Sequence, residues 1–259
     1  MLVSIITLTY NSVDTIEKTL RSIQNQSYKN IEMIFVDNCS TDGTLDILKK
    51  YSNDKTILVS EKDKGIANAF NKGLKLSTGE IVGFLHSDDT LDEKDCIEQM
   101  VNCFQNNPIN FFYANLNYTS KNNKIIRLWK ADEKQGCVDN NLLKKKINFG
   151  WMPPHPTVYL RRNFLERIGE YDEKYKISFD YDYLLRSINN NLIKPYYLNK
   201  NFINMTIGGN SNKSIKNILK KMIEDYKIIK RNLNKGIVVL LLKNITKFPQ
   251  FFIFFKKNQ

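Results

Sequence analysis

Residues 81–89 read Ile-Val-Gly-Phe-Leu-His-Ser-Asp-Asp, an apolar run that ends in two adjacent acids. The apolar part lacks helical period, which is typical of a strand that is covered on both faces of a sheet. Such a strand would leave Asp88 and Asp89 at the rim of the sheet. Negative charge at a rim must be solvated or bound to a cation, so this pair is the first candidate site.

Short strands alternate with helices along the first third of the chain. Residues 3–8, 31–36 and 56–60 are apolar or β-branched runs like residues 81–85, and helical patterns lie between successive runs, the last of them over 66–76. This alternation implies right-handed crossovers and a largely parallel sheet, so we predict an α/β fold with helices flanking a central sheet. Ligands of such folds bind outside the carboxyl ends of the strands.

Polar residues follow each predicted strand and should meet at one rim. They are Tyr10, Asn11, Asp37, Asp63, Asp88 and Asp89. A single acid after a strand is more often a helix cap or a turn former, and we assign that role to Asp42. The set as a whole indicates a site, because clustered acids repel one another unless a cation or hydrogen-bond donors neutralise them.

The predicted rim lacks the glycine-rich loops that commonly hold phosphates. The sequence contains neither a GxGxxG turn nor a GxxxxGK[ST] loop. A bound diphosphate would therefore need another source of positive charge. Mn²⁺ or Mg²⁺ on Asp88 and Asp89 would supply it, because these hard cations prefer oxygen ligands and bridge phosphate oxygens.

Four ordered segments resemble family 2 glycosyltransferases with the GT-A fold. They are residues 3–11, 35–44, 63–73 and 84–89. The resemblance is close over about the first 90 residues and looser to about residue 210. It implies one Rossmann-like GT-A domain with a nucleotide-sugar-binding half, an acceptor-binding half and a C-terminal amphipathic helical tail. These parts span residues 1–95, 96–212 and 213–259.

The resemblance also implies roles for individual rim residues. Those that would contact the nucleotide are Thr9, Tyr10, Asn11, Asp37, Asp63, Lys64 and Asp88. Tyr10 would stack on the nucleobase. Asp89 would be the direct metal ligand, and Asp88 would bind ribose or a water molecule. The chain departs from the family pattern at Ala67 and Asn68, where many relatives carry Tyr-Asp.

A second chemical stretch, residues 178–186, reads Ser-Phe-Asp-Tyr-Asp-Tyr-Leu-Leu-Arg. It begins a predicted helix and resembles the family's (E/D)D-x-D-x-x-x-R element, in which the residue matching Asp180 acts as catalytic base. Phe179 stands where many relatives have Glu, so we expect an apolar wall beside the base. Asp182 is expected to cap the helix.

Three prolines surround His155, at positions 153, 154 and 156. Proline restricts the backbone, so the imidazole is held in a defined place. In the family a histidine near this position often faces the donor sugar or diphosphate, and a satisfied buried histidine is an equally good alternative. We treat His86 as a structural neighbour of the acid pair.

The net charge of +12 is concentrated in the tail. Residues 213–259 contain twelve Lys and Arg and two acids, Glu224 and Asp225, whereas the preceding residues are nearly neutral. The aromatic residues of the tail lie in an apolar block and are not interleaved with basic residues for base stacking. We therefore expect no nucleic acid as a partner.

The tail has the pattern of a surface helix. From Lys213 to Leu233 apolar residues recur every three or four positions between basic ones, and apolar runs follow Gly236 at 237–242 and 248–255. No run reaches the ~18–20 apolar residues of a membrane span. Two alternatives stay open: the helix lies on an anionic membrane, or it packs its apolar stripe on the catalytic domain.

Taken with the resemblance, these features predict an inverting, metal-dependent glycosyltransferase of the hexosyl or N-acetylhexosaminyl class. It would move a sugar from a nucleotide-diphosphate sugar, a UDP-sugar, to a hydroxyl of a glycan or lipid-linked acceptor in surface polysaccharide synthesis. The alternatives are a nucleotidyltransferase acting on sugar phosphates and a non-catalytic nucleic-acid-binding protein that uses the basic tail. The first residues lack the basic region and cleavage site of a signal peptide, so we expect a cytoplasmic protein, peripheral on the inner face of the membrane.

Overall fold

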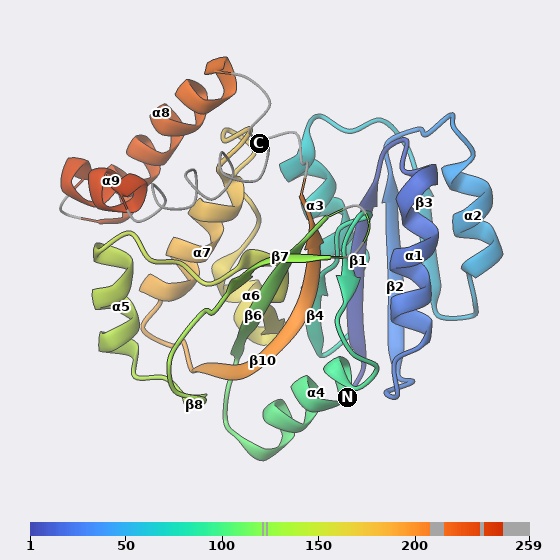
Figure 1. Ribbon diagram of the computed structural model, residues 1–259, viewed down its shortest axis with the longest axis horizontal. Helices are drawn as coiled ribbons and strands as arrows, with labels where there is room; N and C mark the ends of the chain where they lie inside the picture. The colour runs from blue at the N-terminus through green and yellow to red at the C-terminus, as the bar shows by residue number, and fades with distance from the viewer. Residues whose placement is uncertain (121, 123, 208–214, 234–235, 246–259) are drawn as a thin grey trace.

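The computed structural model describes residues 1–120, 122, 124–207, 215–233 and 236–245. Within these residues, one ten-stranded sheet lies at the centre and carries helices on both faces (Figure 1). Successive residues of a strand face opposite sides, so Ile5 and Ile6 enter two different hydrophobic clusters, one on each face of the sheet. This architecture confirms the predicted α/β class with a central sheet flanked by helices.

Four parallel strands and three helices form the N-terminal part of the sheet. In chain order they are β1 (Val3–Thr9), α1 (Val13–Gln24), β2 (Ile31–Asp37), α2 (Thr44–Tyr51), β3 (Thr56–Ser60), α3 (Ile66–Leu76) and β4 (Ile81–Phe84). The strands lie in the order β3-β2-β1-β4 with every pairing parallel, as the alternation predicted. The register places Thr9 beside Asp37 and Asp37 beside Ser60, so these strand ends meet at one rim.

The rest of the sheet is mixed. Its elements in chain order are β5 (Thr90–Leu91), α4 (Cys96–Asn106), β6 (Phe111–Thr119), β7 (Ile125–Trp129), β8 (Gly136–Cys137), α5 (Asn140–Asn148), the 3₁₀ turn η1 (His155–Thr157), β9 (Tyr159–Arg161), α6 (Arg162–Ile168), α7 (Phe179–Asn189) and β10 (Pro195–Thr206). From β4 the sheet continues through β9, β6 and β10 to β5. Strand β9 is antiparallel to both of its neighbours, whereas β6 and β10 are parallel. Strands from residues 1–95 and strands from residues 96–212, the two predicted halves, therefore belong to one continuous sheet.

The junction of the two parts depends on a glycine in β4. Gly83 pairs with Tyr159 of β9, and a Cβ atom at this glycine would lie 2.4 Å from the tyrosine ring. The buried ring therefore occupies the space of any larger side chain. Without a side chain at position 83, β4 can carry the acid motif close against β9.

The tail forms two helices, α8 (Ile215–Asn232) and α9 (Gly236–Ile245), and α8 packs on α7 (Figure 1). On the inner side of α8, Ile228 and Ile229 are fully buried. Asp225 of α8 forms a buried ion pair with Lys243 of α9 at 2.8 Å. One face of the tail therefore packs on the domain, which is one of the two alternatives that the sequence left open.

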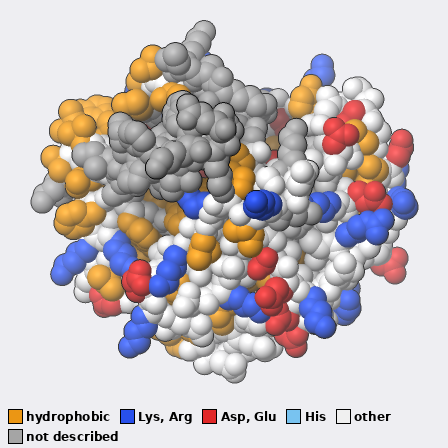
Figure 2. Space-filling model, viewed as in Figure 1, with side chains coloured by type: hydrophobic (Ala, Val, Ile, Leu, Met, Phe, Trp, Pro, Cys, Tyr) orange, Lys and Arg blue, Asp and Glu red, His pale blue; other side chains and the backbone are white. Residues whose placement is uncertain are grey.

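The other face of these helices carries hydrophobic side chains at the surface (Figure 2). The exposed ones are Ile218, Leu219, Met222, Ile223, Tyr226, Ile237, Val238 and Leu241. None of the described helices combines the length and the hydropathy that a bilayer crossing requires. The apolar run predicted at 248–255 and the helix start predicted at Lys213 lie outside the described residues.

Candidate active site

The ends of β1, β2 and β3 meet at a carboxylate that is already saturated with donors. Asp37 is fully buried. It accepts hydrogen bonds from the hydroxyl of Thr9 (2.8 Å), the amide (2.9 Å) and hydroxyl (2.5 Å) of Ser40, and the hydroxyl of Ser60 (2.7 Å). Burial raises the pKa of Asp37, but these donors outweigh it and hold the pKa below its ordinary value. A carboxylate offers about four acceptor positions. A hydrogen bond from a nucleobase or ribose to Asp37 would therefore replace one of these four.

The loop after β1 brings Tyr10 and Asn11 to the same rim. Asn11 has a left-handed backbone conformation (φ 47°), and its backbone N–H donates to the hydroxyl of Ser40 (2.9 Å). Tyr10 is 62% exposed, so its ring is open to a stacking ligand. The hydroxyl oxygens of Ser12 and Ser87 lie 3.1 Å apart, and this contact joins the loop to the acid motif.

Asp42 has the capping role that the sequence predicted. Its Oδ1 accepts from the amide of Thr44 at the start of α2 (3.0 Å), and its Oδ2 accepts from the amide of Val13 at the start of α1 (3.0 Å). One acid therefore satisfies two helix N-termini, and it keeps the loops after β1 and β2 together.

The loop after β3 places Asp63 and Lys64 beside the start of α3. Asp63 forms an ion pair with Lys72 of α3 (2.8 Å), and Lys64 is exposed. Asn68, which departs from the family pattern, donates to Glu173 Oε1 (3.0 Å). This hydrogen bond ties α3 to the segment that precedes α7.

The two members of the acid pair lie in different surroundings after β4. Asp88 is half-buried, whereas Asp89 is only 1% exposed. Asp89 Oδ1 accepts from the amide of Thr206 at the end of β10 (3.2 Å), and Asp89 Oδ2 has no hydrogen-bond partner in the described part of the chain. Burial and the neighbouring Asp88 raise the pKa of Asp89 well above its ordinary value.

These surroundings fit a divalent cation. A buried carboxyl oxygen without a partner costs free energy, and a hard cation would offset that cost by binding it. No group of three His, Cys, Asp or Glu side chains that could hold a metal occurs among the residues that the structure describes. Asp88 and Asp89 would therefore share a cation with oxygens from a ligand or from water.

The rings of Phe70, Phe84, His155 and Tyr171 pack together, and we call this cluster the aromatic floor. His155 Nε2 is 2.9 Å from the hydroxyl of Tyr171. The imidazole centroid lies 5.8 Å from that of Phe70 and 6.2 Å from that of Phe84. Burial lowers the pKa of His155 to about 4 against the opposing effect of Asp180, so the imidazole is uncharged at neutral pH.

Asp180 lies beside this floor in the first turn of α7. It is half-buried, and its Oδ1 accepts from the amide of Tyr181 (2.7 Å). Burial lowers the pKa of His86, and the charges of Asp88 and Asp180 act against this lowering. Phe179 is buried against the aromatic floor and forms the apolar wall that the sequence predicted.

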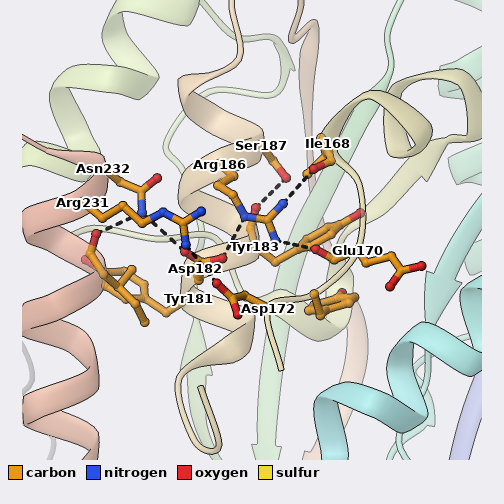
Figure 3. A network of polar contacts seen from close by, with 12 residues as sticks. Ile168, Glu170, Asp172, Tyr181, Asp182, Tyr183, Arg186, Ser187, Arg231 and Asn232 are labelled. Carbon is orange, nitrogen blue, oxygen red and sulfur yellow. Dashed lines mark hydrogen bonds and ion pairs between the residues drawn. The ribbon is translucent and has the colours of Figure 1, made fainter. Parts of the chain in front are cut away.

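Asp182 does not cap α7, contrary to the prediction. The helix begins at Phe179, so Asp182 lies inside it. Asp182 is fully buried and forms an ion pair with Arg186 (2.8 Å), as Figure 3 shows. The guanidinium also donates to the carbonyls of Ile168 (2.7 Å) and Glu170 (2.8 Å), so the pair ties α7 to the end of α6.

The sequence-based prediction missed Tyr171 and Thr206. Tyr171 lies in a segment that reads as a turn, yet it is buried and stacks on Tyr183 with centroids 4.0 Å apart. Thr206 ends a strand whose middle is polar. The fully buried Phe202 and Ile203 are the signal that could have identified this strand.

The structure brings the predicted residues to neighbouring positions on one rim. Thr9, Tyr10, Asn11 and Asp37 gather at the ends of β1 and β2, and Asp63 and Lys64 precede α3. Asp88 and Asp89 follow β4, the His155 ring lies against Phe84 of β4, and Asp180 follows Phe179, whose ring packs on Phe70. The acid pair could bind a cation there, and the half-buried carboxylate of Asp180 is a candidate proton acceptor.

Known proteins are similar to this chain in sequence and in fold. A Bacillus subtilis protein named for teichuronic acid biosynthesis, TuaG, is 48% identical over 103 residues, which are 39% of this chain and only 40% of TuaG. The Escherichia coli UDP-Glc:alpha-D-GlcNAc-diphosphoundecaprenol beta-1,3-glucosyltransferase WfaP is 32% identical over 210 residues, 76% of each chain. The crystal structure of S. aureus TarS 1-349 in complex with UDP-GlcNAc has a TM-score of 0.70 at 22% identity, covering 88% of this chain and 67% of that one.

At 22% identity, the similarity to TarS establishes only the fold of the chain. Its family is established by a match to a sequence model of that family. Residues 4–169, more than half of the chain, match the model described as Glycosyl transferase family 2. The matched region includes β1 to β4, the acid pair and His155. The chain belongs to glycosyl transferase family 2.

Proposed function

We propose that this chain is an inverting glycosyltransferase that uses a UDP-sugar and a divalent cation. Its acceptor would be a hydroxyl of a glycan or lipid-linked glycan in surface polysaccharide synthesis. One observation carries the proposal: the half-buried carboxylate Asp180 directly follows Phe179, whose ring packs on Phe70 beside His155. The name of WfaP records a UDP-glucose donor and a diphosphoundecaprenol acceptor, and this supports the donor and acceptor classes.

Asp180 would act as the general base. In an inverting transfer the acceptor oxygen attacks the anomeric carbon from the face opposite the diphosphate, and the bond to the diphosphate breaks as the new bond forms. Asp180 takes the proton of the attacking hydroxyl. Its Oδ1 accepts from the Tyr181 amide, and this hydrogen bond helps to orient the carboxylate. The neutral His155 can hydrogen-bond the donor without adding charge.

Asp88 and Asp89 would hold Mn²⁺ or Mg²⁺. The cation would stabilise the negative charge that develops on the departing diphosphate. Asp89 Oδ2 has no hydrogen-bond partner among the described residues, which supports its predicted role as metal ligand. Asp88 is the more accessible of the two and adjoins Asp89, so we propose that it contacts the cation as well.

The tail helices would hold the protein on an anionic membrane surface. Leu219 and Ile223 are exposed on α8, and so are Lys220 and Lys227. Apolar side chains of such a helix enter the acyl boundary, and its lysines meet anionic headgroups. A surface location would suit an acceptor that is itself attached to a lipid.

A turnover assay tests this proposal. The full chain is incubated with single UDP-sugars and Mn²⁺, because slow transfer to water identifies the donor without knowledge of the acceptor. A glycosyltransferase releases UDP, whereas a nucleotidyltransferase would release pyrophosphate. Exhaustive chelation should abolish turnover and added Mn²⁺ should restore it. Turnover that survives chelation would rule out the role of the acid pair in metal binding.

Asp180→Asn tests the base. With saturating donor it should lower kcat by about 10²–10⁴-fold, the usual contribution of a positioned general base. The control is Asp54→Asn, which makes the same chemical change at an exposed loop position and should leave kcat unchanged. Near wild-type turnover of Asp180→Asn would show that another group removes the proton.

A further inference from the structure

The start of α7 is capped by a side chain from the tail. Glu224 of α8 accepts hydrogen bonds from three consecutive backbone amides. Its Oε1 accepts from Lys176 (3.0 Å), and its Oε2 accepts from Ile177 (2.9 Å) and Ser178 (2.9 Å). Ser178 is the N-cap residue of α7, and its own hydroxyl makes no capping hydrogen bond within the described residues.

This cap stands next to the proposed base. Asp180 is two residues from Ser178, in the first turn of α7. Amides before and at a helix N-terminus need acceptors, and a carboxylate there is favoured further by the helix dipole. Without Glu224, these three amides would lose their acceptor, and the start of α7 would be free to shift. A shift there would move Asp180 out of the orientation that proton transfer requires.

Glu224 is held in place by contacts elsewhere on α8. Arg231 forms an ion pair with Asp172 (2.9 Å), and Asn232 donates to the Oδ1 of the buried Asp182 (3.4 Å), as Figure 3 shows. Asn189 of α7 donates to the carbonyl of Asn232 (3.0 Å). These contacts involve neither Glu224 nor Asp180, so α8 should stay docked when Glu224 is replaced.

We propose that Glu224 is a positioning residue for Asp180: the tail helix fixes the amides at and before the first turn of α7 and so keeps the base in one orientation toward the acceptor. This inference rests on the proposed function through the role of Asp180 as base. It assigns to the basic tail a part in the reaction that is separate from any membrane contact.

The test is Glu224→Gln, which keeps the shape of the side chain but replaces one acceptor oxygen by an NH₂ donor. We expect kcat to fall about 10- to 100-fold, because displacement of a positioned group by about 1 Å costs on this order. The KM for the UDP-sugar should stay within about twofold of wild type. Glu166→Gln, the same change at an exposed position on α6, is the matched control and should behave as wild type.

A double-mutant cycle separates positioning from general stability. In the Asp180→Asn background there is no base to position, so Glu224→Gln should cause no further loss of the residual kcat. A further loss equal to that in wild type would overturn the proposal, and so would a wild-type kcat for Glu224→Gln alone. If Glu224→Gln does not fold, Glu224→Asp carries the same cycle, since it keeps both oxygens on a shorter side chain.

The outcomes also distinguish this inference from the proposed function. If Asp180→Asn loses turnover and the Glu224 variants do not, only the positioning role fails. If Asp180→Asn keeps full turnover, the base assignment fails and the positioning role fails with it.

Discussion

Two buried carboxyl groups at the same rim have opposite surroundings, and this difference separates their roles. Asp37 has four hydrogen-bond donors, and its pKa lies below the ordinary value. Asp89 has one amide on Oδ1, and its pKa lies well above the ordinary value because burial and Asp88 disfavour its charge. The charge of Asp37 is therefore balanced by hydrogen-bond donors, whereas that of Asp89 is stabilised by a single amide hydrogen bond within the described residues.

His155 gives a prediction on pH and stability. Its pKa is lowered from 6.5 to about 4 by burial, so the folded state favours the neutral imidazole. As the pH falls from 6.5 toward 4, the unfolded chain takes up a proton on His155 and the folded chain does not. Protonation therefore stabilises the unfolded state, and the free energy of unfolding decreases. From pH 6.5 toward pH 4 the wild type should therefore lose free energy of unfolding relative to His155→Gln.

Urea unfolding of both proteins at several pH values in this window measures the difference. His155→Gln removes the imidazole, so titrating groups that do not interact with His155 contribute equally to both curves and cancel. A difference that stays constant between pH 6.5 and pH 4 would contradict a depressed pKa for His155.

At the scale of the element, α7 is fixed from two sides. Glu224 accepts hydrogen bonds from the amides at and before its first turn, and Arg186, paired with the buried Asp182 of the same helix, ties its middle to α6. The aromatic floor supports it through Phe179. A short helix held in this way can keep a reactive side chain at its N-terminus in one orientation.

Arg186→Met should destabilise the fold by about 3–5 kcal/mol, because it leaves the fully buried Asp182 without its cation. The two carbonyls that the guanidinium binds would also lose their donor. Equilibrium urea unfolding measures the change in free energy. Arg167→Met, at an exposed position on α6, is the control. A loss below about 1 kcal/mol, as for a surface ion pair, would contradict this account.

The elements of the N-terminal part were predictable almost to the residue. Strand 56–60 and helix 66–76 have the same bounds in the structure as in the prediction, because their apolar periodicity is strong and polar loops mark their ends. The rim followed from the parallel order of these strands. Local patterns could not reveal Tyr171, Thr206 or Glu224, since each acts through a partner far away in the sequence. Asp182 was misread because an acid near a helix start resembles a cap until its arginine is seen.

At the scale of the whole molecule, charge and exposed hydrophobic side chains are gathered on the tail. The inner face of α8 is buried against α7, and the outer face carries Leu219 and Ile223 with neighbouring lysines. The molecule is therefore one-sided, with a nearly neutral body and a basic, apolar surface at one end.

Vesicle binding tests whether the basic, apolar surface of the tail binds anionic membranes. The full chain should sediment with vesicles that contain anionic lipid and much less with neutral ones, and added salt should weaken the binding. Replacing Leu219 and Ile223 together by Ser should reduce binding, whereas Leu192→Ser, at an exposed position outside the tail, should not. Equal binding to neutral vesicles, or binding that the double substitution leaves intact, would argue against a membrane role.

The contact between Glu224 and the start of α7 also sets an order of events during synthesis. A ribosome adds about 5–20 residues per second from the N-terminus, so the segments that carry Asp37 and Asp88 are made before Asp180, and Asp180 before Glu224. A nascent chain can thus contain these acids while the cap of α7 is still untranslated. With Glu224 in the proposed positioning role, sugar transfer at full rate would wait until α8 has left the ribosome and docked on α7.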